Sequence, residues 1–300
     1  MTNPSPDLYA LIIRLVATQS GRLCATQGHL AHAAFLNILQ QVDSTVSAAI
    51  HDMHGRKPFT ISPLEGYGHP HKGSLNIKTG QEGWLRVTLL DPLLFQTFIS
   101  YFLQGTQKPI IQLENLTFHI SEILSTPGSH QLAGYDSVQN LYSRWEQPEG
   151  PTSQMATIQL HFRTPTAFSM RSSPHRQMHI LPDPPLVFGQ LADYWDRLSE
   201  GTLGTPPGQD TRDTVRLFCA ENVVVARYNL DTHMYEYRRS KQVGFTGRVT
   251  FEILDKEAAD PIKHLNRLAD LAFYTGVGSK TTMGMGQVSR YEVKSTRQKP

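Results

Sequence analysis

The chain has 300 residues, 39% of them hydrophobic and 18% charged, which is typical of a soluble globular protein long enough for about two domains. Its formal net charge of +2, from 28 basic and 26 acidic residues, does not by itself indicate a nucleic-acid-binding protein. Two cysteines are too few for a disulfide framework or a cysteine zinc site. Neither a leader-like start nor an apolar run of about 20 residues is present, so we expect a cytoplasmic protein outside the membrane.

In the first half, the spacing of apolar residues alternates between the periods of strands and helices. The apolar stripe from Ala31 to Val42, and the proline that follows Asp91, are typical of helices. In chain order we expect a strand at 8–16, helices from Gly28 and Asp43, strands at 59–62, 74–78 and 84–90, a helix from Asp91, and strands at 110–113 and 116–124. This order is close to β-α-β-β-α-β, the ferredoxin-like or RRM-like arrangement.

Residues 126–153 are rich in Gly, Pro, Ser and Gln, which predicts a linker between a first domain at 1–125 and a second at 154–300. The second half repeats the pattern of the first. Its expected elements are strands near 155–162, 222–228, 244–253 and 287–293, and helices from Pro184 and Asp260. The expected fold class is therefore α+β, with two tandem ferredoxin-like βαββαβ domains.

A glycine-rich segment, GVGSKTTMGMG at 276–286, lies between the last helix and the last strand. A Walker A loop would need Gly directly before Lys, and the dinucleotide fingerprint would need a glycine where Thr281 stands. ATP and NAD are therefore not supported, and we expect no cofactor. The glycines could supply only the backbone geometry of a tight connection. Alternatively, the segment could contact an RNA backbone through Gly276, Gly278, Lys280, Gly284 and Gly286.

Four segments together are distinctive: LADLAFYTGVGSKTTMGMGQV near the end, IHDMHGRKPFTISPL in the first half, LHFRTPTAF opening the second half, and VGFTGRVTFEI before the last helix. In this order they resemble the repeat-associated RNA-binding Cas proteins, and among these the Cas6 endoribonucleases that cut precursor CRISPR RNA. The resemblance covers most of the chain. It implies two ferredoxin-like domains, RNA in the cleft between them, and metal-independent cleavage of the repeat at the base of a hairpin.

The chemistry that the resemblance implies uses the RNA 2′-hydroxyl as an internal nucleophile and gives a 2′,3′-cyclic phosphate and a 5′-hydroxyl. It requires alignment of the reacting oxygens, two proton transfers and positive charge at the phosphorane. Histidine suits either proton transfer, because its pKa of about 6.5 lies near working pH. His51 matches the family's histidine and lies at a helix end, and Lys57 matches its phosphate-stabilising lysine.

The first helix departs from the family pattern, because Leu36 stands where some relatives have a catalytic tyrosine. Leucine cannot transfer a proton. His32 lies one helical turn earlier on the same face, so we expect it to complete the site. The alternative is an exposed histidine on the helix surface. By the same reasoning His29 is a weaker candidate, and His54 is expected in a solvated turn.

RNA contacts outside the catalytic site are expected from clustered basic residues in the second half. Tyr235 and Tyr237 lie near one cluster and could stack on bases, although a solvated hairpin would show the same pattern. The candidates are Arg171, Arg176, Arg238, Arg239 and Lys241. The sequence has no Cys cluster, His-Glu-x-x-His motif or acidic triplet, so we expect no metal site.

Two functions from different classes agree with these patterns. The first is the endoribonuclease. The second is a non-catalytic guide-RNA-binding subunit of a CRISPR effector complex, because proteins that only hold RNA also use tandem ferredoxin-like folds and glycine-rich loops. The pair His51 and Lys57 favours the enzyme, since a pure binder does not need it. CRISPR repeat RNA is the expected partner, whereas an effector complex and a homodimer stay open.

Overall fold

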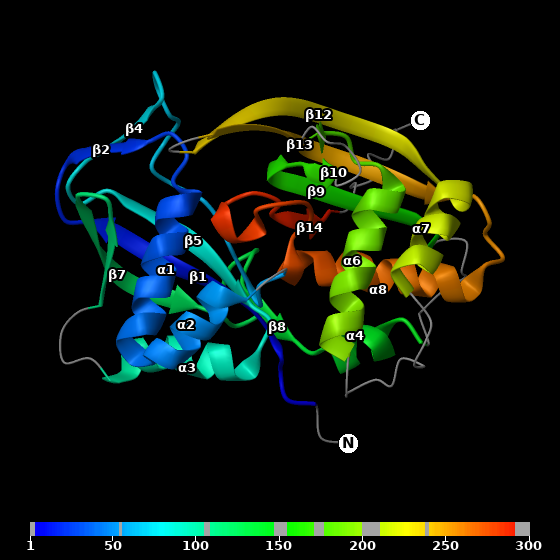
Figure 1. Ribbon diagram of the computed structural model, residues 1–300, viewed down its shortest axis with the longest axis horizontal. Helices are drawn as coiled ribbons and strands as arrows, with labels where there is room; N and C mark the ends of the chain where they lie inside the picture. The colour runs from blue at the N-terminus through cyan, green and yellow to red at the C-terminus, as the bar shows by residue number, and fades with distance from the viewer. Residues whose placement is uncertain are drawn as a thin grey trace, which may run out of the picture.

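The structure is a computed structural model that describes residues 4–53, 56–104, 109–146, 155–170, 177–199, 211–237 and 240–291. Two larger sheets, each covered by helices, form the two halves of the molecule. In Figure 1 the first half lies on the left and the second on the right. A long hairpin of β12 (Val223–Tyr237) and β13 (Ser240–Ile253) crosses the top of the view toward the first half. None of the described helices combines the length and hydropathy that a membrane span requires.

The first sheet has the strand order β3-β5-β1-β7-β6, and all its neighbouring strands are antiparallel. The strands along this order are β1 (Leu8–Ala17), β3 (Phe59–Ile61), β5 (Glu82–Leu89), β6 (Ile110–Leu113) and β7 (Leu116–Leu124). The helices α1 (Gly28–Val42) and α3 (Pro92–Gln104) share a hydrophobic core with this sheet. Without the edge strand β6, the strands of this order and the two helices follow one another along the chain as β1-α1-β3-β5-α3-β7, with other elements between them, and form a βαββαβ unit.

The second sheet has the equivalent strand order, β12-β13-β9-β14. Its first and last strands are β9 (Thr157–Thr166) and β14 (Val288–Arg290), and its helices are α6 (Pro184–Ser199) and α8 (Ala259–Thr275). Just as β1 pairs with β5 and β7, β9 pairs with β13 and β14. The expected α+β class with two tandem ferredoxin-like folds is therefore confirmed.

Some elements differ from the sequence prediction. The predicted strand at 74–78 is β4 (Ser74–Ile77), which pairs with the unpredicted β2 (Gly21–Cys24) in a separate small sheet. The helix α7 (Thr211–Asn222) was not predicted, because its buried side, which includes Val215 and Cys219, makes only a narrow apolar stripe. A second small sheet joins β10 (Phe168–Met170) to β11 (Gln177–His179).

The segment at 126–153, expected to be a linker, contains two regular elements. The strand β8 (Gly134–Asp136) pairs with the start of β1, and the helix α4 (Val138–Arg144) follows directly. Ser137 caps this helix, because its Oγ accepts a hydrogen bond of 3.0 Å from the backbone N–H of Asn140. Val138 and Leu141 are buried in the core of the second half. The polar residues that suggest a linker here form turns and a helix cap.

A buried polar network around Arg86 of β5 joins the two halves. Its guanidinium donates hydrogen bonds to the carbonyl oxygens of Leu132 (2.9 Å) and Phe273 (2.7 Å) and to the side-chain oxygen of Gln287 (2.7 Å). Gln287 follows the glycine-rich segment and also donates to the hydroxyl of Thr60 in β3. The network therefore holds the end of the glycine-rich segment against the first sheet.

Candidate catalytic site

Of the three residues expected to be catalytic, Lys57 bonds directly to the backbone of His51, and His32 lies within electrostatic range of both. His32 is on α1, His51 is the penultimate residue of the helix α2 (Ser44–Asp52), and Lys57 lies just before β3. The charges of His51 and Lys57 both lower the pKa of His32. A short 3₁₀ helix at Thr281–Met283, within the glycine-rich segment, packs against α1 and β3. Both halves of the chain therefore contribute to this site.

His32 is held in one orientation by the glycine-rich segment. Its Nδ1 lies 2.9 Å from the carbonyl oxygen of Thr282, and its ring stacks on Phe59 at 5.6 Å between centroids. Because a carbonyl only accepts, Nδ1 carries the proton, and Nε2 of the neutral ring is an acceptor. Burial lowers the pKa of His32, the bond to Thr282 raises it, and the nearby positive charges lower it. The net shift is downward, which favours a neutral ring able to take up a proton.

His51 and Lys57 are joined through the end of α2. The His51 side chain is 75% exposed, and its Nδ1 lies 3.1 Å from a carboxylate oxygen of the neighbouring Asp52. The Lys57 Nζ donates to the carbonyl oxygens of Ile50 and of His51, the latter at 3.1 Å. These carbonyls belong to the last helical turn, which lacks intrahelical partners. Lys57 therefore caps the helix and places its charge beside His51.

The other candidates on the first helix do not share these features. Leu36 packs against the first hydrophobic core, as expected of a residue with no part in proton transfer. His29 is partly buried on the first turn of α1. His54 lies outside the described residues.

The glycines of the segment 276–286 pack tightly against protein. A Cβ atom on Gly284 would lie 2.4 Å from the Tyr235 hydroxyl, and one on Gly278 would lie 2.8 Å from the Ala167 carbonyl oxygen. The Tyr235 hydroxyl also accepts a hydrogen bond of 3.1 Å from the backbone N–H of Gly28 at the start of α1. Gly276 and Gly286 are packed as tightly against backbone oxygens, and all four glycines have positive φ angles. Lys280 lies in the same segment and is partly exposed.

The expected RNA contacts from the second half are only partly described. Lys241 is exposed at the start of β13, in the hairpin that reaches the first half. Arg171, Arg176, Arg238 and Arg239 lie outside the described residues.

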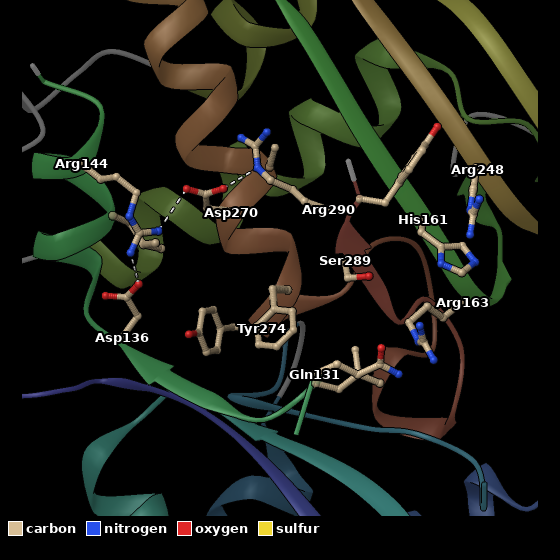
Figure 2. Close-up of a pocket in the computed structure, with 15 residues that line it drawn as sticks. Gln131, Asp136, Arg144, His161, Arg163, Arg248, Asp270, Tyr274, Ser289 and Arg290 are labelled. Carbon is tan, nitrogen blue, oxygen red and sulfur yellow. Dashed lines mark hydrogen bonds and ion pairs between the residues drawn. The ribbon is translucent and has the colours of Figure 1, made fainter. Parts of the chain in front are cut away.

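A second feature, which sequence reasoning did not find, is a basic cavity of about 560 Å³ between α4, α8 and the second sheet. In Figure 2, His161, Arg163 and Arg248 cluster on one side of it. Arg248 and His161 are direct partners across β13 and β9, and Arg163 follows two residues along the same face of β9. The sequence signal was two basic residues two positions apart in β9, His161 and Arg163. It could be recognised only once the pairing of β9 with β13, far away in the sequence, placed Arg248 beside them.

The opposite side of the basic cavity is neutralised by ion pairs. Arg144 bonds to Asp136 at 2.6 Å and to Asp270 at 3.2 Å, and Asp270 also binds Arg290. Figure 2 shows these residues grouped away from Arg163 and Arg248. The positive potential of the cavity is therefore concentrated at the strands of the second sheet.

Comparison with known proteins places both halves in one family. The family model described as CRISPR Cas6 N-terminal domain matches residues 7–143, and that of CRISPR-associated endoribonuclease Cas6 matches residues 160–288. The chain belongs to the Cas6 family. A curated relative, the CRISPR-associated endoribonuclease Cas6 of Streptococcus thermophilus, is 29% identical over 134 residues. That match covers 44% of this chain and 50% of the relative, so it spans about half of the relative's length.

Solved structures of Cas6 proteins are similar over nearly the whole chain. A Cas6 product complex is 28% identical with a TM-score of 0.76, and covers 95% of this chain and 100% of the other. Thermus thermophilus Cas6 is 26% identical with a TM-score of 0.69, and covers 96% and 100%. The two halves of this Cas6 chain therefore have the arrangement found in these relatives.

Proposed function

We propose that this Cas6 protein is a metal-independent endoribonuclease that cleaves precursor CRISPR RNA within the repeat, at the base of a hairpin. The observation that carries the proposal is the meeting of His32, His51 and Lys57 at the junction of the halves. Membership of an endoribonuclease family and similarity to a Cas6 product complex support it. The products would be a 2′,3′-cyclic phosphate and a 5′-hydroxyl.

Each of the three residues has a distinct role in this proposal. His32 takes the proton of the 2′-hydroxyl through Nε2, because its Nδ1 is committed to Thr282. His51, exposed at the end of α2, donates a proton to the departing 5′-oxygen. Lys57 lies beside His51 and supplies positive charge to the phosphorane. No protein nucleophile is needed, since the attacking and leaving oxygens belong to the same RNA.

The RNA would extend from this site along positively charged surface. Lys280 borders the site on the glycine-rich segment, and Lys241 lies on the β12–β13 hairpin. Unpaired RNA beyond the hairpin would contact Arg163 and Arg248 in the basic cavity. Binding should weaken steeply with salt, because each neutralised phosphate releases condensed counterions. Association with an effector complex and formation of a homodimer are further proposals that need separate tests.

The test of the enzyme is cleavage of labelled repeat RNA from the protein's own host in EDTA, under single-turnover conditions. Wild-type protein should cut at one site and leave a cyclic phosphate. His51→Ala should lower the rate by about 10²-fold or more, whereas His71→Ala, at an exposed loop histidine, should not change it. A 2′-deoxy substitution at the cut site should abolish cleavage. Tight binding without cleavage would instead support the non-catalytic guide-RNA binder.

The pH dependence of the rate tests the role of His32. Because burial lowers the pKa of this histidine, the neutral form that accepts a proton persists below the usual value of about 6.5. On the acid side, the single-turnover rate should therefore begin to fall only at pH values below about 6.5, as His32 becomes protonated. His32→Gln should be slower and should lose this acid limb. An acid limb that persists in His32→Gln would assign the proton acceptor to another group.

A further inference from the structure

One face of α6 binds both segments that border the candidate catalytic site. Gln190, Asp193 and Tyr194 are spaced three and four residues apart, so they lie on the same side of the helix. The Gln190 side-chain amide makes two hydrogen bonds to the backbone of Gly278. It donates to the carbonyl oxygen at 2.6 Å and accepts from the N–H at 2.8 Å. This pairing fixes the glycine-rich segment four residues before Thr282.

Arg56 is held by the next two residues of this face. Its Nε lies 2.5 Å from a carboxylate oxygen of Asp193, and its guanidinium lies 4.4 Å from the centre of the Tyr194 ring. The Arg56 and Asp193 side chains are only 24% and 21% exposed, so solvent screens this ion pair less than one on the surface. The contact joins a segment of the first half to a helix of the second.

Each of these two anchors holds a segment that contacts one of the proposed catalytic histidines. Thr282, on the segment held by Gln190, orients the ring of His32. Arg56 directly precedes Lys57, which bonds to the carbonyl oxygen of His51. The exposed His51 ring is hydrogen-bonded to its own neighbour Asp52, so its position depends on the backbone that Lys57 and Arg56 hold. One face of α6 therefore binds both the segment that orients His32 and the segment that bonds to the backbone of His51.

We propose that the Gln190–Asp193–Tyr194 face of α6 is a positioning element that sets the separation of His32 and His51. Arg56 is then a positioning residue that acts through Lys57 and does not contact the RNA. The proposal rests on the proposed function, because it assumes that both histidines take part in the reaction. Misplacement of a catalytic group by about 1 Å can lower a rate by about 10²-fold. Loss of the contacts between Arg56 and α6 should therefore lower the rate of the chemical step.

The test compares Arg56→Gln, Asp193→Asn and the double variant. We expect each single variant to lower the single-turnover rate at saturating RNA by about 10- to 100-fold. The double variant should be no slower than the slower single variant, because the two side chains act as one unit. The Kd for 2′-deoxy repeat RNA, which binds without being cut, should change less than about threefold. The exchanged pair Arg56→Glu with Asp193→Arg should recover part of the rate.

The matched control is Arg197→Gln. Arg197 lies 3.5 Å from the same carboxylate but on the same helix, so its loss leaves the contact between the halves in place. This variant should keep the wild-type rate within about twofold. A lower rate would mean that loss of a positive charge near Asp193, rather than loss of the contact between the halves, slows the reaction. If Arg56→Gln does not fold, Arg56→Lys can replace it. Lysine keeps the charge but loses the planar guanidinium that bonds to Asp193 and stacks on Tyr194, so this variant should show an intermediate rate.

Two results would overturn the positioning role. An unchanged rate at saturating RNA in Arg56→Gln would show that the contacts of Arg56 with α6 do not affect the rate of the chemical step. Weaker binding of 2′-deoxy RNA with an unchanged saturating rate would show that Arg56 contacts RNA. A wild-type protein that does not cleave overturns the proposed function together with this inference. Cleavage that depends on His51 but not on Arg56 overturns this inference alone.

Discussion

Replacement of Arg86 by Ala should lower the free energy of unfolding by about 3–5 kcal/mol. The side chain is 3% exposed, and its three acceptors, from Leu132, Phe273 and Gln287, are all uncharged. A hydrogen bond from a charged donor contributes about 1.5–3 kcal/mol, and the stranded acceptors would stay buried. Three such bonds give about 5 kcal/mol at the low end of that range. Relief of the desolvation of the guanidinium, whose pKa burial lowers, offsets part of this.

Urea unfolding measures this loss, with linear extrapolation to water. Arg14→Ala is the control, since Arg14 on the neighbouring strand is 52% exposed in its ion pair with Glu122 and should contribute less than about 1 kcal/mol. Because the acceptors of Arg86 lie partly in the second half, the variant should also unfold less cooperatively, with a lower m-value or two separate transitions. A loss below about 1 kcal/mol with an unchanged m-value would refute the reasoning.

Two further predictions concern stability. Burial and the charge of Arg267 lower the pKa of His264 to about 4, so the folded state binds this proton less tightly than the unfolded state does. The contribution of neutral His264 to the free energy of unfolding is therefore fully present above pH 6.5 and is lost as the pH falls toward 4, by up to about 3 kcal/mol. Urea unfolding at several pH values should show this decline in stability, and the decline should be smaller in His264→Phe. Gly284→Ala should destabilise by about 2 kcal/mol or more in thermal melts, because φ is +92° and the Cβ would lie 2.4 Å from the Tyr235 hydroxyl. Gly68→Ala, at a similar φ of +84° but in open space, should lose only about 1 kcal/mol.

Much of the fold was predictable because its signals are local. Asp43 was expected to begin a helix, and its carboxylate does accept hydrogen bonds from the backbone N–H groups of Thr45 and Val46. Asp91 does the same for Leu94 at the start of α3. The strands of the two βαββαβ units were recognisable from their apolar patterns, and their order along the chain already indicated the ferredoxin-like fold.

The elements that were missed depend on partners far away in the sequence. β8 is a strand because it pairs with the start of β1, although its own residues are typical of a linker. The helix α7 packs its narrow apolar stripe on the core of the second half. Local periodicity was too weak in both regions: composition predicted a linker at 126–153, and no element was predicted for residues 211–222.

The sequence by itself determined the βαββαβ order of each half, the segment that carries His51 and Lys57, and the helical spacing that made His32 a candidate. Only the tertiary structure decided that Thr282 orients His32 across 250 residues, and that Arg56 reaches Asp193 across 137. The physical reason is the distance along the sequence over which each kind of interaction acts. Periodicity, capping and turns act over a few residues, whereas the contacts that complete a site form only once two sheets and their helices have packed together.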